Sequence, residues 1–244
     1  MESIQIYLNS QYADTYYNGA SDCEYVLPLI EIPDGFHIYV SVVSCLIPYS
    51  FYNVNSYNNI LYYSFDGLTI YNLTFTLGNY NVNNVLNYLN NNLLNGFSVT
   101  YDNIQNRFTF IHATNDFMFM SNSTCFQLLG FTNNMTISSS SLSLTSINCI
   151  NIYNIRTIQV NSNLLTYNIN KLQKNNYCIL CSVPITCTPF SLIEYTNRTN
   201  FKTNLFLNRL SNIKIKLTDE NGNLLNLNGC NYNMTLQLDV VSFV

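Results

Sequence analysis

Hydrophobic and polar residues alternate along much of this chain, which is the pattern of half-buried β-strands. The alternation is clearest at residues 213–217 and 234–243, which are separated by ENGN (220–223), a type I′ turn signal. Residues 37–48 are rich in β-branched side chains and hydrophobic almost throughout, which predicts a strand buried on both faces. The other strands predicted outside the middle of the chain are residues 4–8, 25–30, 147–152, 155–160, 177–183, 192–195 and 204–207.

The middle of the chain, from residue 51 to about residue 134, has a different texture. Runs 60–65 and 71–77 flank Asp66-Gly67, a two-residue hairpin signal, and runs 97–101 and 108–111 predict a second hairpin. A short strand at 117–120 and a helical turn, CFQLLGF, that ends at Gly130 complete this block.

Between the two hairpins, hydrophobic residues recur at the spacing of one helical face, which predicts an amphipathic helix. These residues are Val82, Val85, Leu86, Leu89 and Leu93. Gly96 follows them and is a plausible C-cap glycine. The opposite face is almost all Asn, so tertiary packing, not helix propensity, must hold this helix.

Three strands before the middle block and five or more after it suit an eight-stranded jelly roll. The predicted fold is therefore mostly β: an antiparallel jelly-roll sandwich with a small α+β insert carrying one amphipathic helix. We expect residues 1–52 and 140–244 to form the sandwich and residues 53–139 the insertion domain. SSSSLSLTS (138–146) is expected to be a linker or an exposed strand edge, and two small β domains stay open as an alternative.

Charge is scarce in this chain and argues against a nucleic-acid partner. Only 9% of residues are charged, against about 25% in typical soluble domains, whereas 42 of the 244 residues are Asn. The net charge is −4 and Lys and Arg total nine, so no basic footprint for nucleic acid is visible. The pairs Lys171 with Lys174 and Lys214 with Lys216 are better explained as solvated strand positions.

Targeting and redox signals are also missing from the sequence. The N-terminal residues lack the basic and apolar segments of a secretory signal, and no apolar run reaches the length of a membrane span. We therefore expect no membrane span and assembly in a reducing compartment. The eight cysteines lie mostly in apolar runs and are expected to be small core residues, not disulfide partners.

No motif in the sequence indicates catalysis, a metal or a cofactor. His37 and His112 have no acid or nucleophile patterned around them, so structural roles are expected. Cys178 and Cys181 form a CxxC, but residues three apart on a strand point to opposite faces, and no second such pair exists. A hydrolase is accordingly disfavoured, and the chain is expected not to be an enzyme.

An aromatic run at residues 44–59 is different in kind. Tyr49, Phe51, Tyr52 and Tyr57 crowd the exit of a predicted strand. Tyrosine is enriched at protein interfaces because it offers a large rigid area with a polar tip. The run therefore predicts a possible interface, although covering the junction between the two domains explains it equally well.

Three ordered segments carry a resemblance to a known family. They are YVLPLIEIPDGFHIYVSVVSCLIPYSFYNVNSYNN; LTFTLGNYNVNNVLNYLN with FSVTYDNIQNRFTFI and FQLLGF; and LSNIKIKLTDENGNLLNLNGCNYNMTLQLDV. The series resembles the minor capsid (penton) proteins of virophages, Polinton-like viruses and related large DNA viruses. The resemblance implies a jelly-roll structural protein of the virion, assembled in the host cytoplasm, that forms a homopentamer at the capsid vertex and contacts the major capsid protein. It implies no catalytic residues.

A binding module is the alternative function. Jelly rolls also serve as lectins, so the chain could be a receptor- or glycan-binding β-sandwich on a virion surface. Exposed tyrosines of residues 49–57 would then stack on sugars.

Overall fold

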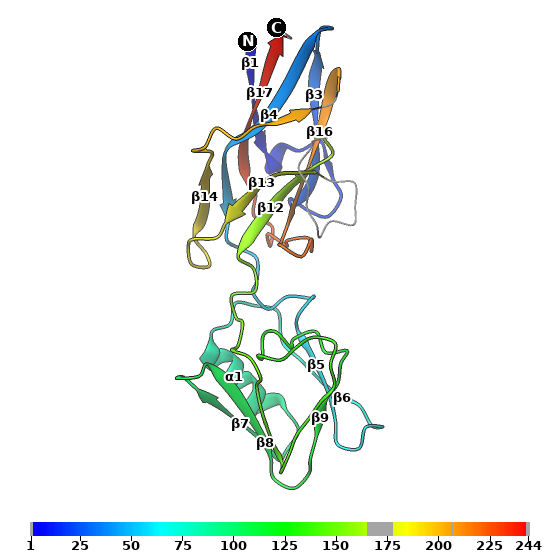
Figure 1. Cartoon of the computed structure of the whole chain (residues 1–244), viewed down its shortest axis with the longest axis vertical. Helices are drawn as coiled ribbons and strands as arrows, with labels where there is room; N and C mark the ends of the chain where they lie inside the picture. Colours follow the sequence, from blue (N-terminus) through cyan, green and yellow to red (C-terminus); the bar gives the residue numbers. More distant parts are fainter. Residues whose placement is uncertain (1, 165–177, 206, 243–244) are drawn as a thin grey trace. The chain divides into compact units, whose positions relative to one another are not determined.

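A computed structural model describes residues 2–164, 178–205 and 207–242 of the chain (Figure 1). The backbone divides into two compact units. The sandwich unit comprises Met1–Phe51 and Ile155–Val244, and the insert unit comprises Tyr52–Asn154. The chain therefore leaves the sandwich unit once, after Phe51, and returns to it at Ile155.

The sandwich unit contains two antiparallel sheets. The first has the order β1-β17-β4-β14, with β15 also paired to β4, and the second has the order β13-β12-β16-β3-β2. Their strands are β1 (Glu2–Asn9), β2 (Thr15–Tyr16), β3 (Asp22–Glu31), β4 (Phe36–Pro48), β12 (Thr157–Ser162), β13 (Cys178–Pro184), β14 (Leu192–Thr196), β15 (Thr203–Leu205), β16 (Arg209–Thr218) and β17 (Asn233–Ser242). A 3₁₀ turn, η1 (Ser10–Tyr12), follows β1.

The pairing of these strands is nested in the manner of a jelly roll. β1 pairs with β17, β3 with β16, β4 with β14, and β12 with β13, all antiparallel. Each pair lies inside the previous one along the chain, as in a long hairpin rolled into two sheets. The insert unit interrupts this hairpin between β4 and β12. The predicted jelly-roll sandwich with an α+β insert is thus confirmed.

Alternation along the strands builds the sandwich core. In β17 the side chains of Met234, Leu236 and Leu238 are buried, and in β16 those of Ile213 and Ile215 are fully buried. Burying one such side chain contributes about 1.5–3 kcal/mol relative to leaving it exposed. The strand predictions at 213–217 and 234–242 are confirmed, whereas residue 243 lies outside the described residues, as do 177 and 206.

Strand β4 differs from the prediction of burial on both faces. Val42 and Cys45 are buried although they are three residues apart, and Leu46 is exposed. The register with β17 shifts here, so that Thr235 faces Ser44 while Leu236 faces Val42. This bulge changes the phase of the alternation, so two half-buried stretches look like one continuous hydrophobic run.

The insert unit is built from two small sheets and one helix. The sheets have the orders β10-β9-β5-β6 and β11-β8-β7. Their strands are β5 (Ile60–Ser64), β6 (Tyr71–Thr74), β7 (Phe97–Asp102), β8 (Arg107–His112), β9 (Met118–Phe119), β10 (Ile137–Ser138) and β11 (Ser143–Thr145). The predicted hairpin of β7 and β8 is confirmed by their antiparallel register. Buried phenylalanines, including Phe108, Phe110 and Phe119, form the centre of a separate core.

Helix α1 (Val82–Asn92) confirms the predicted amphipathic helix, with Val85 and Leu89 fully buried. Asn81 and Asn84 form a reciprocal capping box at its start. Gly96 is not its C-cap: the helix ends at Asn92, and its C-cap is Leu93, whose backbone is extended. Among the helices of the described residues, none is long and apolar enough to span a membrane.

Gly96 serves a different purpose, because its φ of +104° lies in the turn into β7 and a Cβ there would come within 2.7 Å of the His112 ring. The position thus needs glycine for both conformation and space. His112 itself is buried, and its Nδ1 accepts the backbone N–H of Asn115 at 3.0 Å. The structural role expected for this histidine fits these contacts.

The loop between β5 and β6 is longer than the two-residue hairpin that Asp66-Gly67 predicts. Strand pairing stops at Tyr63 and Tyr71. The carboxylate of Asp66 accepts the N–H groups of Leu68 and Thr69 at 2.8 and 2.7 Å. These local hydrogen bonds compete with the strand ladder and hold an open loop.

The second boundary of the insert unit differs from the expected one. Residues 140–154, expected in the sandwich, belong to the insert unit. β11 pairs with β8, and Ile150 and Ile152 are buried in the insert core without forming the strand expected at 147–152. Ile150 and Ile152 pack against the insert core, and this burial gives residues 147–152 the hydrophobic pattern of a strand without strand pairing.

A turn forms at residues 220–223, but it is not the predicted type I′ turn, because Gly222 has a positive φ and Asn221 does not. Nor does it join β16 to β17 as a hairpin. Asp219 N–H donates to the carbonyl of Asn223 at 2.9 Å, and Thr218 bridges to Leu224. The chain then crosses to the other sheet before β17 begins, because the nested topology places these two strands in different sheets.

A Schellman motif closes the predicted helical turn at Gly130. Phe131 N–H donates to the carbonyl of Phe126 at 2.7 Å, and Gly130 N–H to that of Gln127 at 3.2 Å. Gly130 has a φ of +80°, and a Cβ there would lie 2.4 Å from the backbone oxygen of Asn148. This glycine is therefore required twice, by conformation and by close packing.

We predict that Gly130→Ala destabilises the insert unit by about 3 kcal/mol, the sum of a left-handed alanine and a backbone clash. Gly67→Ala is the matched control: its φ is +76°, but the nearest atom to its Cβ would be a methionine methyl at 3.8 Å. It should cost only about 1 kcal/mol. Urea unfolding followed by tyrosine fluorescence measures the stability of both variants. Equal losses of stability would contradict the clash at Gly130.

Candidate interface residues

The predicted aromatic run is divided between the two units. Tyr49 and Phe51 are 6% and 2% exposed, and their rings stack with centroids 4.6 Å apart in the sandwich core. Tyr52 is half-buried and Tyr57 is 51% exposed, both in the insert unit. Tyr49 and Phe51 are thus core residues, a correction to their expected place on an interface, because the chain packs them into the sandwich core just after β4 ends at Pro48. An interface through Tyr52 and Tyr57 stays a prediction.

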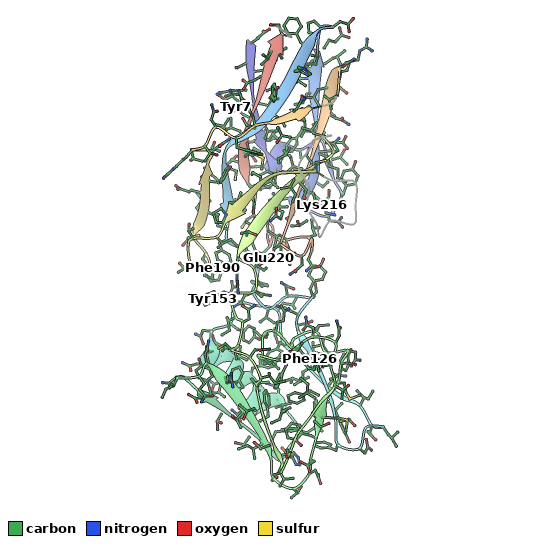
Figure 2. All side chains as sticks on the ribbon, in the orientation of Figure 1. Tyr7, Phe126, Tyr153, Phe190, Lys216 and Glu220 are labelled. Atoms are coloured by element: carbon green, nitrogen blue, oxygen red, sulfur yellow. The ribbon has the colours of Figure 1, made fainter. Side chains whose placement is uncertain are left out.

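Other aromatic residues are far more exposed on the sandwich unit. Tyr7, Tyr12 and Phe190 are 75%, 75% and 82% exposed, and Figure 2 shows Tyr7 and Phe190 on its outside. Sequence reasoning missed them, although Tyr7 lies between Gln5 and Asn9 on the polar side of the β1 alternation. An aromatic side chain on the polar face of a strand is a usable signal of a contact surface.

β1 is the end strand of its sheet and pairs only with β17 in the described part of the chain. Its other edge offers backbone N–H and C=O groups to another strand. Tyr7 lies on this strand, so the edge and an exposed aromatic side chain occur together. Such an arrangement can bind a partner through both main-chain hydrogen bonds and ring packing.

A charged network lies on the outer side of the same sheet. Asp239 on β17 faces Ser3 on β1 and Tyr39 on β4 in the strand register. Its carboxylate accepts hydrogen bonds from Ser3 Oγ at 2.6 Å, Lys202 Nζ at 2.9 Å and Gln237 Nε2 at 2.9 Å. Burial by itself would raise the pKa of Asp239, but these three donors outweigh it and hold the pKa below its usual value.

The two lysines of β16, Lys214 and Lys216, were expected to be solvated, and this is only partly so. Lys214 Nζ lies 3.2 Å from a carboxylate oxygen of Asp22 and 3.5 Å from the centroid of the Tyr17 ring. Its side chain is 16% exposed. An ammonium held by a carboxylate and an aromatic face contributes to local packing. Lys171 and Lys174 lie outside the described residues.

The cysteines are all free, and Cys23, Cys45 and Cys125 are buried. Burial raises the pKa of Cys45 to about 12 and raises that of Cys125 as well. Burial also raises the pKa of Cys181, one member of the CxxC on β13. Thiols with raised pKa values stay protonated and are poor nucleophiles. In the described residues, no group of three or more His, Cys, Asp or Glu side chains is placed to hold a metal ion.

Comparison with solved structures gives a likeness at the level of the fold. The crystal structure of a selenomethionine-labelled mavirus penton protein matches with a TM-score of 0.51 and 11% sequence identity, over 99% of this chain and 100% of that one. No protein-family model matches the chain. No curated protein matches it either. The likeness shows a penton-like fold that extends over the whole chain.

We predict that Asp239→Asn lowers the free energy of unfolding by about 2 kcal/mol at pH 7, because it weakens charge-assisted hydrogen bonds in a buried site. The native pKa is depressed, so the stabilisation is present above the unfolded value of about 3.9 and is lost as pH falls through the native one. The difference in free energy of unfolding between the wild type and the variant should therefore narrow only below about pH 4. Urea titrations across pH measure this, with Asp34→Asn in an exposed turn as the control; a constant gap would refute it.

Proposed function

We propose that this chain is a penton-type minor capsid protein, which assembles as a homopentamer at a capsid vertex and contacts the major capsid protein. The observation that carries the proposal is the whole-length fold likeness to a mavirus penton protein. A likeness that covers the insert as well as the jelly roll is more specific than a shared sandwich alone. The exposed aromatic side chains and the open edge of β1 support a part for the sandwich unit in assembly, beside that of Tyr57 in the insert unit.

The proposal assigns a structural role, not a catalytic one. The protein with the similar fold is itself a capsid component. The buried thiols stay protonated, and the buried His112 accepts a backbone N–H, so neither is presented to a substrate. Low charge also suits a protein that buries large surfaces on assembly, because an amide can exchange water for a partner hydrogen bond at less cost than a charge.

A receptor- or glycan-binding module is the second candidate function. It is supported by the insert unit, whose surface carries many Asn and Tyr side chains and few charges. The two functions are compatible, because an assembled vertex protein can also present a binding surface.

Native mass is the first test of the vertex proposal. Light scattering during size-exclusion chromatography should give five times the chain mass of 28.0 kDa. The five-fold mass should persist on dilution if the contacts are extensive. A monomer over the whole concentration range would contradict self-assembly in solution. Absence of the protein from purified virus particles would contradict the capsid role.

Tyr57→Asp tests whether the aromatic run contributes to assembly. Because Tyr57 is 51% exposed, we expect the fraction of pentamer to fall while the melting temperature changes little. Tyr153→Asp is the matched control in the same unit, at 77% exposure. If Tyr57→Asp keeps the native mass of the wild type, the interface lies elsewhere.

A further inference from the structure

An open groove lies on the insert unit between α1 and the segment that precedes it. It has a volume of about 470 Å³, within the usual range for ligand sites. One wall is the Asn-rich face of α1, which presents Asn84, Asn87, Tyr88 and Asn91 at helical spacing. The other wall is residues 77–80.

The second wall is held rigidly by hydrogen bonds. Gly78 and Val54 exchange two backbone hydrogen bonds, at 3.0 and 3.1 Å. The Asn53 side chain donates to the carbonyl of Tyr80 at 2.8 Å and accepts its N–H at 2.8 Å. A wall fixed in this way loses little entropy when a ligand binds, so the groove is preorganised.

Aromatic rings in the groove are fixed as well. Tyr88 stacks on Phe75 with centroids 4.8 Å apart and meets Tyr80 edge-on at 5.9 Å. Its hydroxyl donates to the carbonyl of Thr74 at 2.7 Å. Tyr80 and Tyr88 are both half-buried, so part of each ring remains open to the groove.

Amide groups in the groove have unused hydrogen-bonding capacity. The side chains of Asn87 and Asn91 make no hydrogen bond to any described residue, and Nδ2 of Asn79 is buried without an acceptor among them. Each primary amide offers two donor hydrogens and an acceptor oxygen. Asn87 and Asn91 are exposed, so their amides can exchange hydrogen bonds with water for hydrogen bonds with a polar ligand.

The charge of the insert unit narrows the chemistry of that ligand. Among residues 52–154 the charged side chains are Asp66, Asp102, Asp116 and Arg107. Each aspartate accepts backbone N–H groups: Asp66 and Asp102 cap their own turns, and Asp116 holds Leu142. None of these residues lines the groove. The groove therefore has no charged side chain that could pair with a phosphate, a carboxylate or a cation.

We propose that this groove binds a neutral carbohydrate. Sugar hydroxyls both donate and accept, which matches primary amides, and the C–H face of a pyranose packs on an aromatic ring. A charged ligand would lack a counter-ion here, and an apolar ligand would leave the amides unpaired. The site lies within one unit, so it does not depend on the oligomeric state.

The test uses the full chain, fluorescently labelled, on an array of neutral oligosaccharides of hexoses, deoxyhexoses and N-acetylhexosamines, with sialylated and sulfated oligosaccharides beside them. We expect binding to one or more neutral glycans. The double variant Asn87→Ala/Asn91→Ala should weaken that binding about tenfold or more, measured by calorimetry with the bound glycan. Asn83→Ala, on the same helix but outside the groove, is the matched control and should bind as the wild type does.

Alanine favours helix more than asparagine does, so none of these variants should lower the melting temperature. Lost binding therefore cannot be ascribed to unfolding. The proposal is overturned if no neutral glycan binds, if only charged glycans bind, or if the double variant binds as tightly as the wild type.

Discussion

The antiparallel ladder between β4 and β17 is the interaction on which the sandwich unit depends. It pairs Phe36 with Ser242 at one end and Leu46 with Asn233 at the other, across nearly the whole length of both strands. β4 precedes the insert unit and β17 comes last, so the ladder joins the two parts of the chain that the insert separates. β1, β14 and β15 then attach to this pair. Most of these contacts are distant in sequence, which makes the fold intrinsically slow to form.

Charge is distributed very unevenly between the two units. The sandwich unit holds all the ion pairs found among the described residues, including Lys202 with Asp239 and Lys214 with Asp22. The insert unit is stabilised instead by clustered phenylalanines and by asparagine side chains that bond backbone groups, as Asn53 and Asn90 do. An uncharged polar surface costs less to desolvate than a charged one. A contact surface and a sugar-binding groove both exploit that property.

Several features of the fold were readable because they depend on local pattern. Period-two alternation identified β16 and β17, the 3.6-residue spacing identified α1, and Gly130 marked the end of a helical turn. These patterns reflect which face of one element meets the core, and that information lies in consecutive residues. Ordered sequence segments also indicated the penton-like fold that the structural comparison shows.

What the sequence determined by itself was thus most of the element types, the low charge and the presence of strands on both sides of an insert. Only the tertiary structure decided that Tyr49 and Phe51 are core residues while Tyr7 is exposed, that β4 carries a bulge, and that residues 140–154 belong to the insert unit. It also brought the Asn face of α1 beside Tyr80 to form a groove. Each of these depends on contacts between residues far apart in the chain. A local hydrophobic pattern is the same whether its partner lies in one unit or the other, so only the packed structure selects between them.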